Sequence, residues 1–226
     1  MISLVFPTYN EEENLNKLYA ELVSVTDKIT GENFEFIFVD DCSADRTPEI
    51  LRELNNKDPR VKTIRFAKNS GSHAALSAGL GAAQGQCAMV MAADLQDPPE
   101  IIVQLLAEWK KGAQTVWGAR KKRQGESFFT QLFAKIYYFL VNYLTPVRLP
   151  PEGADVFLAD RKVLEALRNI PEKHSSIFMA VAWLGFKQAT VYYVKEARHG
   201  GKSKWTLKRK LKLAFDSLVN FRAARN

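Results

Sequence analysis

Three oxygen-bearing side chains, Asp94, Gln96 and Asp97, lie within four residues of one another. They follow residues 86–92, an apolar run that predicts a short buried strand, and precede two prolines that stop the strand and open a helix over residues 100–110. In an open parallel α/β sheet, ligands bind outside the carboxyl ends of the strands. Carboxylate and amide oxygens suit Mg2+ or Mn2+ held by few protein groups and completed by ligand phosphates. The alternative is that the two acids only cap and charge the N-terminus of the helix.

A second acidic pair, Asp40 and Asp41, follows another apolar run, residues 34–39, which predicts a buried parallel strand. A carboxylate at such a strand end can accept a hydrogen bond from a base N–H and so select a nucleotide. Acids in loops and helix caps are common, so a purely structural role stays open for this pair.

The strands and helices that would position these acids are predicted to alternate along the chain. Strands are predicted over residues 2–6, 34–39, 61–66, 86–92 and 115–118, and helices over residues 11–28, 45–55, 73–83 and 100–110, with Pro7 ending the first strand and Asn10 capping the first helix. This repetition predicts an α/β fold with a doubly wound, mostly parallel sheet. Gly79, Gly81 and Gly85 fall late in a predicted helix, so they predict close packing on the sheet rather than a dinucleotide loop.

Positive charge is concentrated at the C-terminal end of the chain. The 226 residues carry a net charge of +7, and residues 195–226 alone hold ten Lys or Arg against two Asp or Glu, a balance of +8 that leaves −1 for residues 1–194. A basic amphipathic helix is expected over residues 206–221, and such helices lie on membrane surfaces, although an ordinary helix packed on the sheet is the alternative. The near-neutral body and the lack of a DNA- or RNA-reading motif argue against nucleic acid.

Three motifs resemble the family-2 glycosyltransferases of the GT-A fold in order and spacing: PTYNEEENL at 7–15, VDDCSAD at 39–45 and ADLQDPPE at 93–100. The closest branch is that of dolichyl-phosphate mannose synthase and the bacterial polyprenyl-phosphate sugar transferases, and the resemblance runs from about residue 4 to about residue 218. It implies metal-assisted, inverting transfer from a UDP- or GDP-linked sugar, with UDP favoured, to a polyprenyl phosphate. The family often has an acid where Ala92 stands, so the resemblance implies that Mg2+ or Mn2+ rests on Asp94 and Gln96.

The resemblance also implies which residues hold the donor. Base and ribose would be held by Pro7, Tyr9, Glu11, Asp40 and Asp41. The family often has Gly where Cys42 stands, so the turn after Asp41 is expected to differ slightly.

Basic side chains in two loops are candidate ligands for the donor diphosphate. Arg120 and Arg123 begin and end a basic run that follows a predicted strand, and Arg binds phosphate as a bidentate fork. Arg198, Ser203 and Lys204 lie in a glycine-rich loop that resembles a family segment and could close over the pyrophosphate. Most such runs are solvated surface, which is the alternative.

Asp155 lies in residues 153–158, which resemble the family's Gly-Asp-Phe-Arg-Leu segment, although Ala154 is inserted and Phe157 replaces the Arg. The resemblance implies a role near the acceptor. A hydroxyl acceptor needs a base, whereas a phosphate, with a second pKa of about 6, is already mostly ionised. Asp155 is therefore expected to be a base for a hydroxyl and a positioning group for a phosphate; an ordinary acid at a strand edge is the alternative.

These observations predict a glycosyltransferase domain over residues 1–205 and a juxtamembrane helix over residues 206–226. Residues 128–144 are rich in aromatic side chains and predict a helix that is partly core and partly interfacial. No signal peptide and no run of roughly 18 apolar residues is predicted, so the expected location is the cytoplasmic face of the membrane, as a peripheral or a truncated anchored protein. The rival interpretations are a soluble glycosyltransferase acting on a hydroxyl, a nucleotidyltransferase, and a non-enzymatic membrane-binding module. A homo-oligomer is a further option.

Overall fold

The computed structural model describes residues 1–121, 149–150, 153–170 and 176–196. Strands and helices alternate through most of this part of the chain, as the sequence predicts. The strands are β1 (Ile2–Thr8), β2 (Phe34–Asp40), β3 (Val61–Arg65), β4 (Cys87–Val90), β5 (Thr115–Arg120), β6 (Ala154–Asp160) and β7 (Gln188–Tyr193). The helices are α1 (Leu15–Thr26), α2 (Thr47–Lys57), α3 (Ser72–Ala82), α4 (Ile101–Lys110), α6 (Arg161–Arg168) and α7 (Ile177–Trp183).

The strands form one sheet in the order β3-β2-β1-β4-β6-β5-β7. Strands β3, β2, β1 and β4 are parallel, β6 is antiparallel to both of its neighbours, and β7 is parallel to β5. The carboxyl ends of all strands except β6 therefore meet at one edge, together with the amino end of β6. The predicted α/β fold with a mostly parallel sheet is confirmed.

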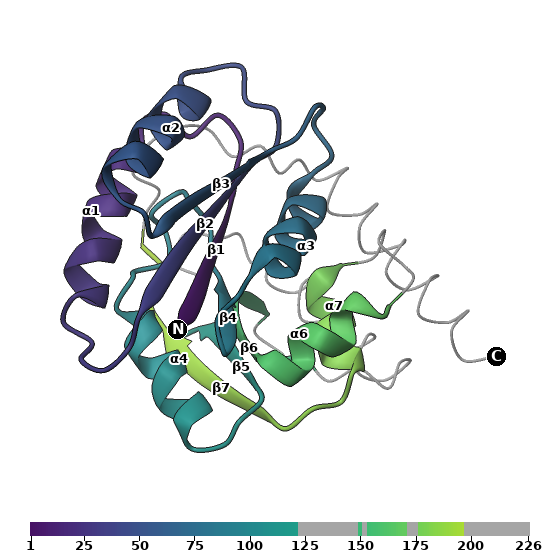
Figure 1. The fold of residues 1–226 in the computed structure, drawn as a ribbon. Helices are drawn as coiled ribbons and strands as arrows, with labels where there is room; N and C mark the ends of the chain where they lie inside the picture. The colour runs from purple at the N-terminus through teal and green to yellow at the C-terminus, as the bar shows by residue number, and fades with distance from the viewer. Residues whose placement is uncertain (122–148, 151–152, 171–175, 197–226) are drawn as a thin grey trace.

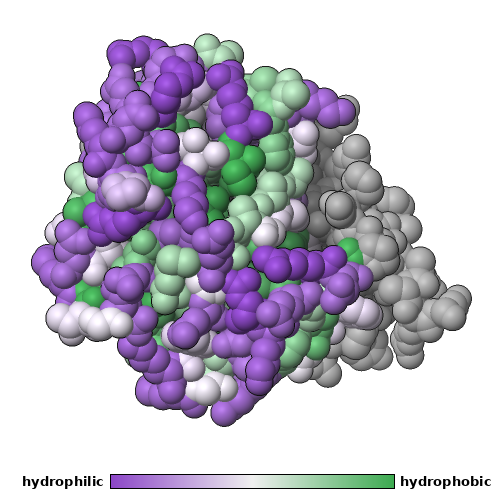
Figure 2. All heavy atoms as spheres, in the orientation of Figure 1, coloured by the Kyte–Doolittle hydropathy of each residue, from purple (hydrophilic) through white to green (hydrophobic). Residues whose placement is uncertain are grey.

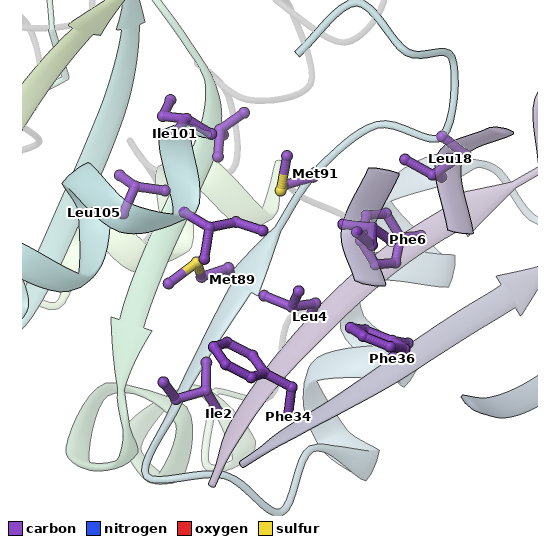
Figure 3. Packing of buried hydrophobic residues seen from close by; sticks show 14 of the residues in the cluster. Ile2, Leu4, Phe6, Leu18, Phe34, Phe36, Met89, Met91, Ile101 and Leu105 are labelled. Carbon is purple, nitrogen blue, oxygen red and sulfur yellow. The ribbon is translucent and has the colours of Figure 1, made fainter. Parts of the chain in front are cut away.

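Helices cover both faces of the sheet, with α1, α2 and α4 on one side and α3, α6 and α7 on the other (Figure 1). On each face of the sheet, the helices and strands enclose a separate apolar core. Figure 3 shows how side chains from β1, β2, β4, α1 and α4 meet in the first core. In it the rings of Phe6 and Phe38 stack with centroids 5.0 Å apart. Full burial of each such side chain contributes about 1.5–3 kcal/mol, which fixes the strands and hence the loops at their ends.

Gly79 lets α3 lie directly against β1. A Cβ at this position would sit 2.3 Å from Cγ1 of Val5 and 3.1 Å from Cγ2 of Val39. No side chain larger than hydrogen fits there without moving the helix. The interpretation of this glycine as a close-packing residue is confirmed.

Two predicted boundaries near the start of the chain are wrong, the end of the first strand and the beginning of the first helix. Pro7 lies inside β1, opposite Val39 of β2, and does not end the strand. Pairing of β1 with β4 ends at Val5, so Pro7 lies where β1 has a strand partner on one side only. A proline is tolerated there because no ladder bond is lost on the open side.

The first helix begins at Leu15 rather than at residue 11, and Asn10 is not its cap. Asn10 has a left-handed φ of 52° and connects two loops instead. Its Oδ1 accepts from the Ala44 N–H at 2.9 Å, and its own N–H donates to Ser43 Oγ at 2.9 Å. The loop after β1 is thereby bound to the loop after β2.

Hydrophilic residues cover much of the face seen in Figure 2, with a paler, more hydrophobic band over α3. Across the described part of the chain, no helix combines the length and the apolar character needed to cross a membrane. The predicted aromatic helix at 128–144 and the predicted helix at 206–226 lie outside the described residues.

Candidate active site

Four chain segments bring charged side chains together at the carboxyl edge of the sheet. The loop after β4 supplies Asp94 and Asp97, β5 ends at Arg120, Asp155 is the second residue of β6, and Lys195 follows β7. The antiparallel direction of β6 is what brings Asp155 to this edge, because its first residues lie beside the last residues of β5.

Two cationic side chains contact the same carboxylate oxygen of Asp155. Its Oδ2 accepts from Nε of Arg120 and from Nζ of Lys195, the latter at 3.2 Å. Burial alone would raise the pKa of Asp155, but the hydrogen bond from Arg120 and the charges of both cations outweigh it and hold that pKa below its ordinary value. Asp155 is therefore an anion at neutral pH and a weak base. Arg120 and Asp155, predicted separately as a diphosphate ligand and as a residue near the acceptor, are thus in direct contact.

Asp97 is the most deeply buried acid of this edge, with no exposed side-chain surface. Its Oδ1 accepts from the Tyr193 hydroxyl at 2.5 Å and lies 3.3 Å from Nζ of Lys195. Its Oδ2 has no hydrogen-bond partner among the described residues. Burial raises the pKa of Asp97, and the nearby Asp155 carboxylate adds to this against the opposing charge of Lys195.

The loop that carries Asp94 and Gln96 has an unusual backbone. Leu95 between them is buried and adopts a left-handed φ of 58°, which is uncommon for a bulky residue. Asp94 Oδ1 accepts from the Gln96 N–H at 3.2 Å, and Gln96 contacts Glu196 twice. The Glu196 N–H donates to the Gln96 carbonyl at 2.9 Å, and Gln96 Nε2 donates to the Glu196 carbonyl at 3.4 Å.

This geometry does not support the capping alternative. Helix α4 begins at Ile101 with Glu100 as its N-cap residue and without a side-chain cap bond. Asp97 instead accepts a hydrogen bond from Tyr193 and forms an ion pair with Lys195, both in the β7 segment. Asp97 therefore connects the loop after β4 to the β7 segment rather than capping α4.

The donor set at Asp94 and Gln96 fits a divalent cation held by few protein groups. The amide nitrogen of Gln96 donates to Glu196, so the amide oxygen is the atom of this side chain that could bind a cation. Nowhere in the described ranges do three or more His, Cys, Asp or Glu side chains form a metal-binding cluster. Mg2+ is commonly bound in this way, by one or two protein oxygens, with water and phosphate oxygens completing the shell.

The acids after β2 have distinct roles. Asp41 accepts from the Ser70 N–H at 2.6 Å and from the Gly71 N–H at 2.8 Å, so both of its oxygens hold the loop before α3. Cys42 after it has a φ of 63°, in the region that favours glycine. The turn therefore keeps a left-handed backbone at the position where the resembled family often has Gly.

Asp40 is buried and is one of the residues that line a cavity. Oδ1 accepts from the Ser43 N–H at 3.0 Å, and Oδ2 lies 3.3 Å from Nε of Arg65 without meeting hydrogen-bond geometry. The cavity lies between α2 and the end of β3, and it is lined by Asp40, Pro48, Leu51, Arg52, Thr63, Ile64 and Arg65. An acceptor and a donor side by side at such a cavity can read the edge of a base.

The other predicted donor residues lie next to this pair. Pro7 and Tyr9 are half-buried at the end of β1, the strand beside β2. Glu11 follows in the same loop, where its N–H donates to Thr47 Oγ1 at 2.8 Å and its carboxylate accepts from Asn14. The structure thus brings the predicted donor set together at the ends of two adjacent strands. Arg123, Arg198, Ser203 and Lys204 lie outside the described residues.

Sequence reasoning missed the contribution of β7. Tyr193 and Lys195 were not predicted as site residues, and Asp97 was placed at the strand-end site without an assigned role. The signal was present: residues 188–193 contain Val and Tyr in a run typical of a strand, and a charged residue follows its end. The rule that ligands bind at strand carboxyl ends would have included Lys195.

The chain matches the family described as glycosyl transferase family 2 over residues 3–168. It belongs to this family and is a glycosyltransferase.

Two curated relatives align along almost the whole chain. The chain is 43% identical over 219 residues to "Uncharacterized glycosyltransferase YkcC" of Bacillus subtilis, covering 97% of this chain and 68% of that protein. It is 31% identical over 220 residues to the bactoprenol glucosyl transferase of Shigella phage SfV, covering 97% of this chain and 71% of that protein.

Two solved structures share the fold. S. aureus TarS 1–349 in complex with UDP-GlcNAc has a TM-score of 0.64 at 19% identity, over 97% of this chain and 65% of that one. Glucosyl-3-phosphoglycerate synthase from Mycobacterium tuberculosis, in complex with Mn2+, UDP and phosphoglyceric acid, has a TM-score of 0.67 at 18% identity, over 99% of this chain and 78% of that one. The fold is therefore GT-A, as the sequence motifs indicated, and the chain spans slightly less than two thirds of the TarS chain.

Proposed function

We propose that this glycosyltransferase transfers a sugar from a nucleotide-diphospho-sugar, UDP-linked, to a polyprenyl phosphate at the cytoplasmic face of a membrane, with inversion at the anomeric carbon. The observation that carries the proposal is the ion-paired state of Asp155 between Arg120 and Lys195. The similarity to a bactoprenol glucosyl transferase supports the same acceptor class.

The acceptor follows from the chemistry of Asp155. A hydroxyl acceptor must lose its proton during transfer and requires a base of suitable pKa. Asp155 accepts bonds from two cations, and its pKa is lowered, so it is poorly suited to that task. A phosphate acceptor has a second pKa of about 6 and needs no base. Asp155 is then a positioning group that fixes the cation of Arg120 beside the reacting centre.

The donor half of the site would hold a divalent cation and the diphosphate. Asp94 and Gln96 offer the protein oxygens for Mg2+ or Mn2+, and a GT-A neighbour contains Mn2+ with UDP. When bound, the cation offsets charge on the departing nucleoside diphosphate. Arg120 would add a further positive charge, and Arg123, Arg198, Ser203 and Lys204 are proposed to do so from the two basic loops.

The nucleotide would be recognised after β1 and β2. Asp40 is the better candidate for the base than Asp41, because Asp41 uses both oxygens on the backbone of the 70–71 loop. Asp40 and Arg65 present an acceptor and a donor together, which matches the adjacent N–H and carbonyl of uracil or guanine. Pro7, Tyr9 and Glu11 would hold the base and ribose from the neighbouring loop.

The donor is tested by calorimetric titration of UDP, GDP and CDP, each with and without Mn2+. We expect one nucleotide to bind tightly only with Mn2+, and Asp94→Ala to abolish that binding. The acceptor is tested by transfer from the matching radiolabelled nucleotide-sugar to a polyprenyl phosphate and to its dephosphorylated alcohol in the same detergent. Transfer to the alcohol alone would support the hydroxyl-acceptor enzyme, and binding to anionic vesicles without any nucleotide binding would support the non-enzymatic membrane module.

A further inference from the structure

Lys195 contacts two acids at this edge, the fully buried Asp97 and the partly buried Asp155. Its Nζ lies 3.2 Å from Asp155 Oδ2 and 3.3 Å from Asp97 Oδ1, and its side chain is 15% exposed. Asp97 belongs to the loop that carries the proposed metal ligands, whereas Asp155 holds Arg120. One ammonium group therefore connects the donor half of the site with the acceptor half.

This bridge is separate from the contacts that hold β7 in place. The backbone of this segment is fixed on both sides, since the Lys121 N–H donates to the Tyr193 carbonyl at 2.7 Å and the Glu196 N–H donates to the Gln96 carbonyl at 2.9 Å. The Tyr193 hydroxyl adds a third contact, to Asp97. Loss of the Lys195 side chain would therefore leave the position of the strand unchanged. It would remove only the contacts of Lys195 with the carboxylates of Asp97 and Asp155.

Without Lys195, two neighbouring carboxylates would lose their shared counter-ion. Asp155 would retain its bond to Arg120, but in the described part of the site no other side chain would contact both Asp155 and Asp97 directly. A lysine is a compact point charge with three donors, and a bridge between two acids uses two of them.

We propose that Lys195 is a positioning residue for sugar transfer, which sets the place of Asp155 and Arg120 relative to the Asp94–Asp97 loop by bridging Asp97 and Asp155. The role rests on the proposed function. It concerns the alignment of two substrates, so its loss reduces turnover more than binding of either substrate.

The test compares Lys195→Met, which keeps the length of the side chain without the charge, with Lys195→Arg, which keeps the charge. Lys187→Met is the matched control, because Lys187 is exposed at the opposite end of β7. Transfer of sugar to a polyprenyl phosphate in detergent gives kcat and KM, and calorimetry with UDP and GDP in Mn2+ gives donor-site affinity without the acceptor.

We expect Lys195→Met to lower kcat by at least about tenfold, because a misplacement of about 1 Å can cost about a hundredfold in rate. The KM for the nucleotide-sugar and the nucleotide affinity should change less than about threefold, as expected when only alignment is lost. Lys195→Arg should recover most of kcat, and Lys187→Met should match the wild type. Should Lys195→Met not fold, Lys195→Gln takes its place in the series.

A double-mutant cycle identifies the partner. If Lys195 acts through Asp155, the double variant Lys195→Met/Asp155→Asn should be no slower than Asp155→Asn alone. The role of Lys195 would be overturned if the kcat losses of the two single variants multiplied in the double variant. It would also be overturned if Lys195→Met had the same kcat as Lys187→Met. Either result would leave the proposed function in place. A wild type that transfers nothing to the polyprenyl phosphate would refute the proposed function, and the role of Lys195 with it.

Discussion

Tyr193 at the end of β7 donates its hydroxyl to the carboxylate of Asp97 across 96 positions of sequence, at 2.5 Å and away from solvent. Burial and the adjacent carboxylates raise the pKa of Tyr193 far above its ordinary value, so it remains a donor throughout the range in which the protein is folded. The bond fixes the end of the loop that begins with Asp94. Through it, a strand at the far side of the sheet determines where the loop after β4 lies.

Tyr193→Phe should destabilise the fold without emptying space in the core. The change removes one hydroxyl and leaves Asp97 Oδ1 with Lys195 alone, and the loss of a buried hydrogen bond to a carboxylate costs about 1–3 kcal/mol. Urea unfolding measures the loss. Tyr192→Phe is the control, because the neighbouring Tyr192 is 47% exposed and should change the free energy of unfolding by less than about 0.5 kcal/mol. Equal effects of the two variants would contradict a specific bond at Tyr193.

Asp94→Asn should remove metal-dependent nucleotide binding. The substitution keeps the shape of the side chain but removes the negative charge that a hard divalent cation prefers. Calorimetry with the preferred nucleotide should then give the same weak affinity with and without Mn2+, a loss of at least about tenfold in the presence of the metal, as losing a charged ligand costs more than about 1.4 kcal/mol. Asp27→Asn is the control, since Asp27 is exposed and pairs with Arg60 elsewhere. Unchanged Mn2+ dependence in Asp94→Asn would place the metal on other residues.

Glu35 should make stability depend on pH in the acid range. It is buried at the end of the sheet away from the site, where its carboxylate accepts from Ser3, from the Gln84 N–H and from Lys62. Burial opposes ionisation, but these bonds outweigh it and hold the pKa of Glu35 below 4.5. A lowered acid pKa stabilises the fold above the unfolded value and loses this contribution as pH falls toward the folded value.

Unfolding titrations between pH 7 and pH 3 should therefore show a loss of stability below about pH 4.5 that is shallower in Glu35→Gln, with a difference in slope of up to about 1.4 kcal/mol per pH unit. Glu53→Gln, an exposed change on α2, should keep the wild-type slope. Identical slopes in Glu35→Gln and the wild type would show that Glu35 is not held in this way.

His73 should make stability depend on pH in a range that begins higher than the range of Glu35. It lies at the start of α3, where its Nδ1 accepts from the Ile177 N–H at 3.4 Å and its ring meets Phe178 edge to face. Burial lowers its pKa from 6.5 to about 4. The unfolded chain therefore takes up a proton first, and stability should fall as pH drops from 6.5 toward 4. His73→Asn should flatten the stability curve in that window, and a curve as steep as that of the wild type would contradict a neutral buried imidazole.

The fold was predictable because its signals are local. Apolar runs bounded by Gly and Pro specify β1 to β5, and their alternation with helices indicates a mostly parallel sheet. The acids after β2 and β4 were found for the same reason, since each follows a strand end directly. Asn10 was misassigned because a good N-cap residue can equally bond to another loop, and only tertiary structure decides between the two.

The pairing of Arg120 with Asp155 could not be derived from local signals. It depends on β6 entering between β4 and β5 in the antiparallel direction, which no short pattern encodes. Lys195 was counted in the basic C-terminal arm because net charge describes a stretch of sequence and not the partners of each side chain. Its burial against two acids follows from the parallel pairing of β7 with β5, the last strand pairing in the sheet.

Asp155→Asn distinguishes the two roles that this carboxylate could have in transfer. As the base for a hydroxyl acceptor, its removal would abolish most turnover and would remove the acid limb of the pH–rate profile, because that limb reports ionisation of the base. As a positioning group for a phosphate acceptor, its removal loosens Arg120 and Lys195 but leaves the nucleophile ionised. We therefore expect a loss of about ten- to a hundredfold in kcat, with an acid limb that persists near the second pKa of the phosphate, about 6. The measurement is kcat against pH from 5 to 9 for the wild type and the variant, with Asp27→Asn, an exposed acid that follows α1, as control. A profile that loses its acid limb in Asp155→Asn alone would make Asp155 the base and the acceptor a hydroxyl.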